Sequence, residues 1–286
     1  MAINFSVLKT RTLSAVVFVA LMLGGILWNQ WSFFILFTVV QIGCLIEFQK
    51  LMRIIIPEYA AINKVHQWGT LCLGIFIMII FSFQNIAFEG ASIALYCNYA
   101  FIAMVVIILL ADLITKKFNV KAILVSATGL IYISLGLALL FPLRNIMSHS
   151  FIGDLGYTIP LVLVVSIWVN DSAAYLVGSL IGRRRLSRIS PNKTWEGTIA
   201  GIIISIFLVT KTLGQYIPLN EKIIFLISIV ACIAGTLGDL VESKLKRWAN
   251  VKDSGSMMPG HGGFLDRFDS ILLATPFVWL LIQLLY

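Results

Sequence analysis

The stretch from residue 243 to 269, SKLKRWANVKDSGSMMPGHGGFLDRFD, is the most polar part of a chain that is 59% hydrophobic and only 12% charged. It combines five Lys or Arg, three Asp, four Gly and one of only three His residues. Basic side chains bind phosphate oxygens, carboxylates hold divalent cations, and glycines let backbone N–H groups approach a polyphosphate. These residue types at this density predict a site for a nucleotide and a metal ion.

Two pairs of carboxylates flank the glycine-rich part of this stretch, Asp239 with Glu242 and Asp266 with Asp269. Within each pair, the spacing of three places both side chains on one face of a helix. Two such pairs at adjacent helix ends could converge on one Mg²⁺, which prefers carboxylate, water and phosphate oxygens. Surface salt bridging to neighbouring basic residues is the alternative for either pair alone. We expect metal binding, because both pairs flank the same loop.

The sequence between the pairs, KDSGSMMPGHGG, contains four glycines and a proline and predicts an irregular loop rather than a helix. A flexible linker is the alternative, but Lys252, Asp253 and His261 are closely spaced for one. His261 could donate to a phosphate, act as an acid or base, or only order the loop. No hydroxyl or thiol nucleophile with an adjacent base is found in the sequence, so a covalent intermediate is not predicted.

A further acidic group, Asp171, follows Asn170 near the middle of an apolar run. A carboxylate at that depth in a membrane costs at least about 2.5 kcal/mol, so it should face a cavity or a partner rather than lipid. An interhelical hydrogen bond is the alternative to a functional role. We expect the functional role.

The loop at 182–197, GRRRLSRISPNKTWEG, precedes the next apolar run. Pro191 excludes a continuous helix there, and Lys193 beside Thr194 at a helix N-terminus would form an anion site. Glu196 has two interpretations, as part of that site or as a first-turn carboxylate that complements the helix dipole. The arginines at 183–185 are interpreted as topology determinants or contacts to anionic lipid rather than as catalytic groups.

Long apolar runs recur along the whole chain, and its mean hydropathy of +0.97 is typical of a membrane protein. A membrane-spanning helix needs about 20 mostly apolar residues. The sequence therefore predicts an all-α, polytopic membrane protein with about nine transmembrane helices. They are expected at 12–28, 31–48, 66–84, 93–114, 122–143, 158–181, 195–213, 222–241 and 269–286.

Basic residues are distributed unequally between the two sides that these helices define. Of the 21 Lys and Arg, all but Arg144, Lys211 and Lys222 fall on the side that holds the N-terminus. The positive-inside rule therefore predicts a cytoplasmic N-terminus and a C-terminus outside. The net charge of +8 follows from this asymmetry and does not indicate a nucleic-acid partner. The four cysteines lack ligand spacing and are interpreted as small buried hydrophobes.

Polar motifs are concentrated in the second half of the chain. The first five predicted helices carry few polar residues apart from Glu47 and Asp112, which lie near helix ends. We therefore divide the chain in two. Residues 1–150 are expected to supply packing, lipid-facing surface or an oligomer interface, and residues 151–286 the catalytic helices with a cytoplasmic nucleotide and metal site.

Together these motifs resemble the signature of the phosphatidate cytidylyltransferase (CDP-diacylglycerol synthase) family. The resemblance rests on SKLKR at 243–247, KDSG at 252–255 and PGHGGFLDRFD at 259–269, and extends to Asn170–Asp171, SPNKTWEG at 190–197 and Gly238–Asp239. Met258 stands where the family usually has Leu, Ile or Phe. Asn192 stands where many members have Lys, which weakens a phosphate-binding role at that position. The likeness covers residues 165–286 and is only architectural before them.

The resemblance implies the reaction of CTP with phosphatidate to give CDP-diacylglycerol and pyrophosphate, dependent on Mg²⁺ alone or with a second cation. It also assigns roles to residues of this chain. The implied catalytic residues are Asp239, Asp266, Asp269, Lys246 and His261, and the implied metal ligands are Asp171, Asp239, Glu242, Asp266 and Asp269. The implied substrate-binding residues are Lys193, Thr194, Asn170, Arg247, Lys252, Asp253, Gly255, Gly262, Gly263 and Arg267.

The expected partners are CTP, phosphatidate and membrane lipid, together with a second copy of the chain in a homodimer. We expect the protein in a bacterial inner membrane, with its active site facing the cytoplasm. A polyprenol or phytol kinase is the nearest rival, since it would bind CTP similarly but release CDP. A transporter is a rival of a different class, although few charged groups lie along a transmembrane path. The Asp-rich motif of the CDP-alcohol phosphotransferases is absent from the sequence.

Overall fold

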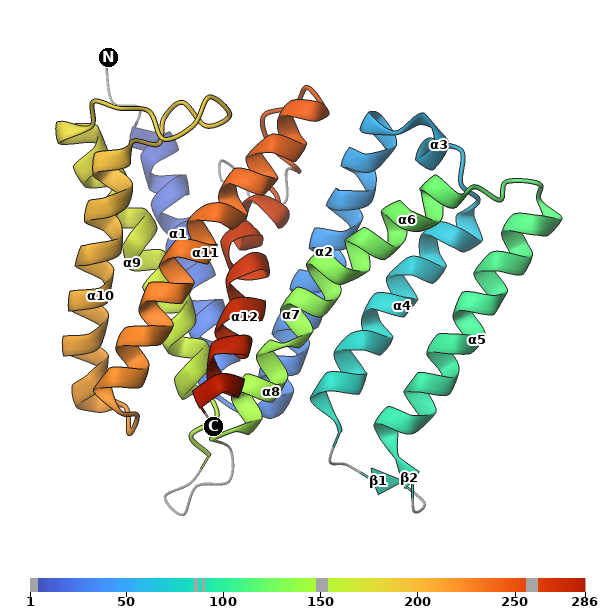
Figure 1. Cartoon of the computed structure of the whole chain (residues 1–286), viewed down its shortest axis with the longest axis horizontal. Helices are drawn as coiled ribbons and strands as arrows, with labels where there is room; N and C mark the ends of the chain where they lie inside the picture. Colours follow the sequence, from blue (N-terminus) through green and yellow to red (C-terminus); the bar gives the residue numbers. More distant parts are fainter. Residues whose placement is uncertain (1–4, 85–86, 89–90, 148–153, 256–261, 286) are drawn as a thin grey trace. The chain divides into compact units, whose positions relative to one another are not determined.

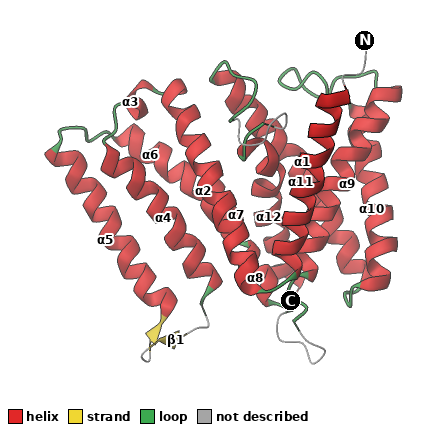
Figure 2. Ribbon diagram, turned by 180° about the vertical axis from the view of Figure 1, so that it is seen from behind, coloured by secondary structure: helices red, strands yellow, loops and turns green. Residues whose placement is uncertain are grey.

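The computed structural model describes residues 5–84, 87–88, 91–147, 154–255 and 262–285 (Figure 1). Helices make up most of this part of the chain (Figure 2). The strands β1 (Ala87–Phe88) and β2 (Ala91–Ser92) form one short antiparallel ribbon between the helices α4 (Lys64–Ser82) and α5 (Ile93–Ile114). The all-α prediction is confirmed.

The chain divides into two compact units, each built from helices. Unit 1 comprises Met1–Ala138 and Trp248–Phe268, and unit 2 comprises Leu139–Arg247 and Asp269–Tyr286. Besides α4 and α5, unit 1 contains α1 (Phe5–Leu27), α2 (Gln30–Ile55), α3 (Pro57–Ala60), α6 (Val120–Gly129), a π-helical segment (Leu130–Leu135) and α7 (Gly136–Ala138). Unit 2 contains α8 (Leu140–Asn145), α9 (Thr158–Ile181), α10 (Trp195–Tyr216) and most of α11 (Glu221–Trp248) and α12 (Leu265–Leu285).

Eight helical stretches in the described residues are long and apolar enough to cross a membrane, so the protein is an integral membrane protein. They are Gln30–Ile55, Lys64–Ser82, Ile93–Ile114, Val120–Asn145, Thr158–Ile181, Trp195–Tyr216, Glu221–Trp248 and Leu265–Leu285. The predicted first span at 12–28 overlaps α1, whose described apolar part, Ser14–Leu27, is shorter than these eight. The helix count is thus close to the predicted nine, and the orientation of the termini stays a prediction.

A capping box sets the break between α1 and α2. Asn29 Oδ1 accepts the N–H of Ser32 at 2.8 Å, and Ser32 Oγ accepts the N–H of Asn29 at 3.1 Å. These bonds satisfy N–H groups that the first turn of a helix leaves unpaired. The chain can therefore reverse within two residues, and α1 and α2 pack against each other.

In unit 2, glycines allow α9 and α10 to pack at close range. Gly197 and Gly201 of α10 lie against α9 backbone at Ala174 and Asn170. Small residues at such positions favour close helix approach in a membrane, where backbones can then make extensive van der Waals contact. The polar residues at the middle of α9 are thereby held next to the start of α10.

Buried serines tie the same part of α9 to its neighbours. Ser205 Oγ of α10 donates to the carbonyl oxygen of Ser166 at 2.8 Å, and Ser166 Oγ donates to Ser228 Oγ of α11 at 3.0 Å. Hydrogen bonds between helices contribute about 0.6 kcal/mol each on average in a membrane protein. They hold α9, α10 and α11 in one register, and Asp171 follows little more than one turn later on α9.

Candidate active site

Four charged side chains of unit 2, Asp171, Lys193, Asp239 and Asp269, form a group that we name the acidic cluster. They come from α9, the loop before α10, α11 and α12, respectively. Lys193 Nζ forms an ion pair with Asp239 Oδ2, and about a quarter of each side chain is exposed (25% and 27%). Asp171 and Asp269 both interact electrostatically with this pair. The fold of unit 2 thus brings four of the sequence-predicted residues together.

Asp269 is the buried member of the acidic cluster, with 7% of its surface exposed. Its Oδ1 accepts the N–H of Ser270 at 2.6 Å, and the charges of the other three members act on it. Here α11 approaches α12 closely because residue 238 is glycine, and a Cβ on Gly238 would overlap the Asp269 carbonyl oxygen. The result is three carboxylates around one ammonium group, an excess of negative charge that a bound cation would relieve.

Asn170 and Asp171 are adjacent on α9 but have different surroundings. Asn170 is buried, and its Nδ2 donates to Thr236 Oγ1 of α11 and to Asp171 Oδ1, both at 3.4 Å. Asp171 is exposed and belongs to the acidic cluster. The interhelical hydrogen bond that the sequence left as an alternative is therefore made by Asn170, whereas Asp171 contributes its charge to the cluster.

Carboxylate oxygens suit Mg²⁺, so the donor chemistry of the acidic cluster fits the predicted metal. Within the described part of the chain, however, no three His, Cys, Asp or Glu side chains are placed to hold an ion. Asp239 would have to exchange the ammonium group of Lys193 for a metal ion. Glu242, another predicted ligand, is fully buried and pairs with Lys246 at 2.5 Å. Metal ligation by these residues stays a prediction.

A short hairpin between α9 and α10 positions Lys193. Arg185 and Thr194 form an isolated antiparallel bridge, and the N–H of Leu186 donates to the carbonyl oxygen of Lys193 at 2.8 Å. Thr194 is the N-cap of α10, because its Oγ1 accepts the N–H of Gly197 at 3.2 Å. The predicted substrate-binding residue Thr194 therefore starts the helix that follows Lys193.

Glu196 orders the base of this hairpin. Its carboxylate accepts the N–H groups of Arg183 and Arg184 at 3.1–3.2 Å. It also lies in the first turn of α10, where a negative charge complements the helix dipole. Of the two interpretations that the sequence left open, these contacts favour the local, structural one.

In unit 1, Glu47 of α2 orders a second group of residues, which we name the signature loop (residues 252–255 and 262–266). The Glu47 carboxylate accepts hydrogen bonds from Ser254 Oγ at 2.7 Å and from the N–H groups of Phe264 and Leu265 at 3.0 and 2.9 Å. Sequence reasoning gave Glu47 no role. The available signal was a carboxylate near the end of an apolar run. Its partners lie 207 to 218 residues further along the chain, so no local motif connects Glu47 to them.

Asp266, a predicted metal ligand, binds the same loop from the first turn of α12. Its Oδ2 accepts the N–H of Gly263 at 2.7 Å and the N–H and hydroxyl of Ser254 at 3.0 Å each. A carboxylate with several N–H donors has its charge compensated by the backbone. In this structure Asp266 therefore holds the signature loop in place through these hydrogen bonds.

Glycines of the signature loop make room for these carboxylates. A Cβ on Gly255 or Gly263 would overlap the Glu47 carboxylate. Gly262 has a φ of +83°, in a region that residues with a side chain rarely adopt. Three glycines that the sequence assigned to nucleotide binding thus have a conformational requirement of their own.

The remaining predicted substrate-binding residues lie at the surface of the structure. Arg247, Lys252, Asp253 and Arg267 have exposed side chains. His261 lies outside the described residues, so its placement stays open to the roles predicted for it. Exposure leaves the basic groups accessible to an anionic ligand, and their substrate-binding roles stay predictions.

Comparison with known proteins agrees with the motifs. The model of the family described as "Cytidylyltransferase family" matches residues 9–285. A phosphatidate cytidylyltransferase of Bacillus subtilis (strain 168) is 38% identical over 187 residues, which cover 65% of this chain and 67% of that protein. One of Staphylococcus epidermidis is 46% identical over 119 residues (41% and 45%), and one of Staphylococcus haemolyticus is 37% identical over 184 residues (63% and 67%). The predicted resemblance is confirmed, and the chain belongs to the cytidylyltransferase family.

Proposed function

We propose that this protein transfers a cytidylyl group from CTP to phosphatidate, which gives CDP-diacylglycerol and pyrophosphate in phospholipid biosynthesis. Family membership supports the proposal, because the relatives above carry the name of that enzyme. The structural observation that carries it is the acidic cluster, in which a lysine forms an ion pair with one of three carboxylates that three membrane helices contribute. A membrane location suits an enzyme that has one water-soluble and one lipid substrate.

The reaction does not require a covalent bond between the protein and a substrate. A phosphate oxygen of phosphatidate attacks the α-phosphorus of CTP, a new P–O bond forms, and the bond to the β-phosphate oxygen breaks with its electron pair leaving on pyrophosphate. The nucleophile is already an anion, so no side chain has to remove a proton. The main barrier is the approach of two anions, which positioning and fixed positive charges lower.

Lys193 is the side chain best placed to supply such a charge. Its backbone is fixed by the hairpin before α10, and its ammonium group is held by Asp239 at one edge of the acidic cluster. A phosphate group could therefore meet a lysine that is already oriented, which reduces the entropy lost on binding. Arg247 of unit 2 is exposed and is proposed to add charge at the phosphates, and Lys252 and Arg267 of unit 1, also exposed, are proposed substrate-binding residues.

Asp239, Asp269 and Asp171 are the residues that would hold Mg²⁺ in unit 2. When bound, Mg²⁺ would neutralise the triphosphate and the developing charge on pyrophosphate. The protein's own part is to keep the three carboxylates within electrostatic range of one another, although they repel. That arrangement is costly without a cation, so it favours cation binding over a purely structural role.

The signature loop has a different task in this proposal. Glu47 and Asp266 accept the N–H groups of Gly263, Phe264 and Leu265, which include those at the start of α12. These N–H groups are therefore not available to a phosphate, although a helix N-terminus is otherwise a favourable anion site. We infer that the loop presents its side chains and its other backbone groups to the nucleotide.

We also propose that the protein lies in a bacterial inner membrane with its active site facing the cytoplasm, and that it forms a homodimer.

The test is an assay of detergent-purified protein with CTP radiolabelled at the α-phosphate, with phosphatidate, and with or without Mg²⁺. The expected result is a chloroform-soluble, labelled CDP-lipid that requires both phosphatidate and Mg²⁺, with one pyrophosphate released per lipid. Release of CDP when a polyprenol replaces phosphatidate would identify a lipid kinase instead. CTP that is unchanged with either lipid would contradict the proposed function.

A further inference from the structure

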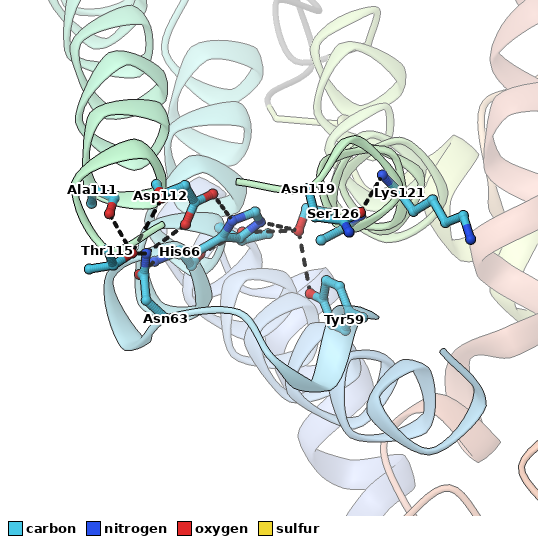
Figure 3. Close-up of polar contacts among 11 residues, drawn as sticks. Tyr59, Asn63, His66, Ala111, Asp112, Thr115, Asn119, Lys121 and Ser126 are labelled. Atoms are coloured by element: carbon cyan, nitrogen blue, oxygen red, sulfur yellow. Dashed lines mark hydrogen bonds and ion pairs between the residues drawn. The ribbon is translucent and has the colours of Figure 1, made fainter. Parts of the chain in front are cut away.

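A hydrogen-bonded chain of Asp, His and Ser lies in unit 1, apart from the residues discussed above (Figure 3). His66 of α4 has its Nδ1 2.6 Å from Asp112 Oδ2 of α5 and its Nε2 2.9 Å from Ser126 Oγ of α6. All three side chains are buried, with exposed fractions of 2%, 1% and 7% for His66, Asp112 and Ser126. This is the connectivity of a nucleophile, a base and an orienting acid.

Neighbouring groups fix the orientation of this chain. Asn63 Nδ2 donates to the other oxygen of Asp112 at 2.6 Å, and Asn63 Oδ1 accepts the N–H of His66 at 2.7 Å. With Asp112 as a carboxylate, which only accepts hydrogen bonds, His66 would carry its proton on Nδ1 and present Nε2 as an acceptor. In that tautomer Ser126 Oγ, 2.9 Å away, would donate its hydroxyl proton to Nε2, which is the arrangement that activates a serine.

A cavity of about 230 Å³ adjoins the chain and reaches both reactive groups. His66, Thr70 and Ser126 line its polar end, and apolar residues of α4, α5 and α6, such as Leu73, Phe101 and Ile108, line the rest. Phe101 and Ile108 are seven residues apart, which corresponds to about 10 Å along a helix axis. The cavity is therefore an apolar slot, long enough for part of an aliphatic chain, that ends at a serine hydroxyl.

The position of the chain along its helices suits a reaction at the membrane surface. His66 is in the first turn of α4 and Asp112 is in the last turn of α5. In the membrane-spanning stretch of α5 only 11% of residues are buried, so the rest of the chain leaves most of this helix uncovered. A lipid chain could enter beside α5, while water reaches the polar end from the helix termini.

We propose that Ser126, His66 and Asp112 form a second reactive centre that hydrolyses a long-chain acyl ester whose chain occupies the adjoining cavity. Ser126 Oγ bonds to the ester carbonyl carbon while its proton moves to His66 Nε2. The bond to the ester oxygen then breaks, and the leaving alcohol takes that proton. Water attacks the acyl-serine in the same way, which releases the carboxylic acid and restores the serine.

One hydroxyl group beside Ser126 could bind the carbonyl oxygen as it gains charge. Tyr59 Oη lies 3.4 Å from Ser126 Oγ, whereas Thr70 Oγ1, at the same distance, donates its proton to the carbonyl oxygen of His66 at 2.8 Å. Burial raises the pKa of Tyr59 above its ordinary value, so its hydroxyl keeps its proton and can donate. Hydrogen-bond donors in such positions stabilise the oxyanion of an acyl-transfer transition state.

The test uses the full-length protein in detergent and a fluorophosphonate probe with a ten-carbon alkyl chain, which reacts covalently with activated serines. Mass spectrometry should find the adduct on Ser126. Labelling should be lost in Ser126→Ala and in His66→Gln, and should fall at least about a hundredfold in rate in Asp112→Asn, which loses the orienting charge. Ser134→Ala is the matched control, since Ser134 is a buried serine of the same unit whose Oγ accepts from Gln41.

A second pair of variants tests the cavity without touching the three residues. Ile108→Trp should fill the slot and slow labelling at least about tenfold, whereas Ile107→Trp, at an exposed position on the same helix, should not. Long-chain p-nitrophenyl ester hydrolysis should follow the same order. A folded wild-type protein that is not modified at Ser126, or labelling that persists in His66→Gln, would overturn the proposal and leave a structural hydrogen-bond network. Thermal unfolding of each variant establishes that it is folded.

Discussion

The signature loop of unit 1 and the acidic cluster of unit 2 use the same functional group, a carboxylate, in two different ways. Asp266 and Asp269 make the contrast sharpest, since they lie three positions apart on α12. Asp266 accepts two backbone N–H groups and a hydroxyl from the signature loop. Asp269 accepts the N–H of its neighbour Ser270 and otherwise lies in the field of two carboxylates and one lysine.

The difference shows that the surroundings of a carboxylate, and not its spacing in a motif, decide what it can do. Backbone N–H donors compensate a negative charge and fix the loop that supplies them. Neighbouring carboxylates do the opposite, because they leave an excess charge that a cation can neutralise. We therefore expect substitutions in the signature loop to reduce stability as well as activity, and substitutions in the acidic cluster to reduce activity alone.

The largest effect on activity is expected for Asp269→Asn. The amide is nearly the same size as the carboxylate but carries no charge, so the rate of CDP-lipid formation should fall by about 10²- to 10³-fold. The unfolding temperature should stay the same or rise, because the change removes repulsion between the buried Asp269 carboxylate and its two negatively charged neighbours. Radiolabelled CTP turnover across a series of Mg²⁺ concentrations, with thermal unfolding in detergent, measures both quantities.

Asp239→Asn is the companion variant, and it should behave in the same way because its carboxylate belongs to the same acidic cluster. A higher Mg²⁺ requirement in both variants would support cation binding there. If either variant kept wild-type turnover and wild-type Mg²⁺ dependence, the acidic cluster would not be the cation site.

Glu47→Gln should have the second largest effect, and it should change two properties together. The amide places an NH₂ group against N–H donors that now meet a carboxylate oxygen, so the free energy of unfolding should fall by about 1–3 kcal/mol. Loss of loop order should lower turnover by about 10- to 100-fold, as is typical when a residue that positions a site is changed. Glu58→Gln is the control, because Glu58 forms an exposed ion pair with Lys121.

Asp266→Asn tests whether the carboxylates that hold the signature loop differ in role from those of the acidic cluster. We expect it to resemble Glu47→Gln, with lower stability and lower turnover, since it also removes acceptors of loop N–H groups. If the variant lost activity but kept wild-type stability, Asp266 would have the same role as Asp269, and the proposed difference between the two carboxylates would be wrong.

Much of the fold could be predicted from the sequence, because long apolar runs have one stable outcome in a membrane. The eight described apolar helices fall where the runs predict them, and the capping residues Asn29 and Thr194 lie at the breaks between runs. α1 shows the limit of this reasoning: it begins at Phe5, seven residues before the predicted run at 12–28, because the ends of an apolar run do not fix the ends of a helix. Orientation was argued from charge and stays a prediction.

The site could be predicted only where its residues belong to local motifs. Asp171, Lys193, Asp239 and Asp269 were each found from a polar residue near a helix end or within an apolar run. Glu47 was missed because its partners are over 200 residues away in the chain. The contact between His66 and Ser126 has no local signal for the same physical reason, because packing of α4 and α6 joins residues 60 positions apart.

Lys193→Gln should have a smaller effect than the changes described so far. The variant keeps the hairpin and loses the ammonium group, so Asp239 is left without its ion-pair partner. The KM for CTP should rise by about tenfold, because one of several positive charges at the triphosphate is missing. Lys211→Gln is the matched control, since Lys211 forms an exposed ion pair with Glu221 at the far end of α10. An unchanged KM would remove Lys193 from the proposed phosphate site.

Glu196→Gln should have the smallest effect and tests whether the hairpin matters only through Lys193. Its carboxylate accepts the N–H groups of Arg183 and Arg184, and the amide can still accept through its one remaining oxygen. We therefore expect a rise of about threefold in the KM for CTP with little change in kcat, because an exposed hydrogen bond is weak in high dielectric. The double variant Glu196→Gln with Lys193→Gln should show no additional rise in KM, since a disordered hairpin has no further consequence once the ammonium group is gone. Effects that multiply would instead mean that Glu196 acts on the substrate independently of Lys193.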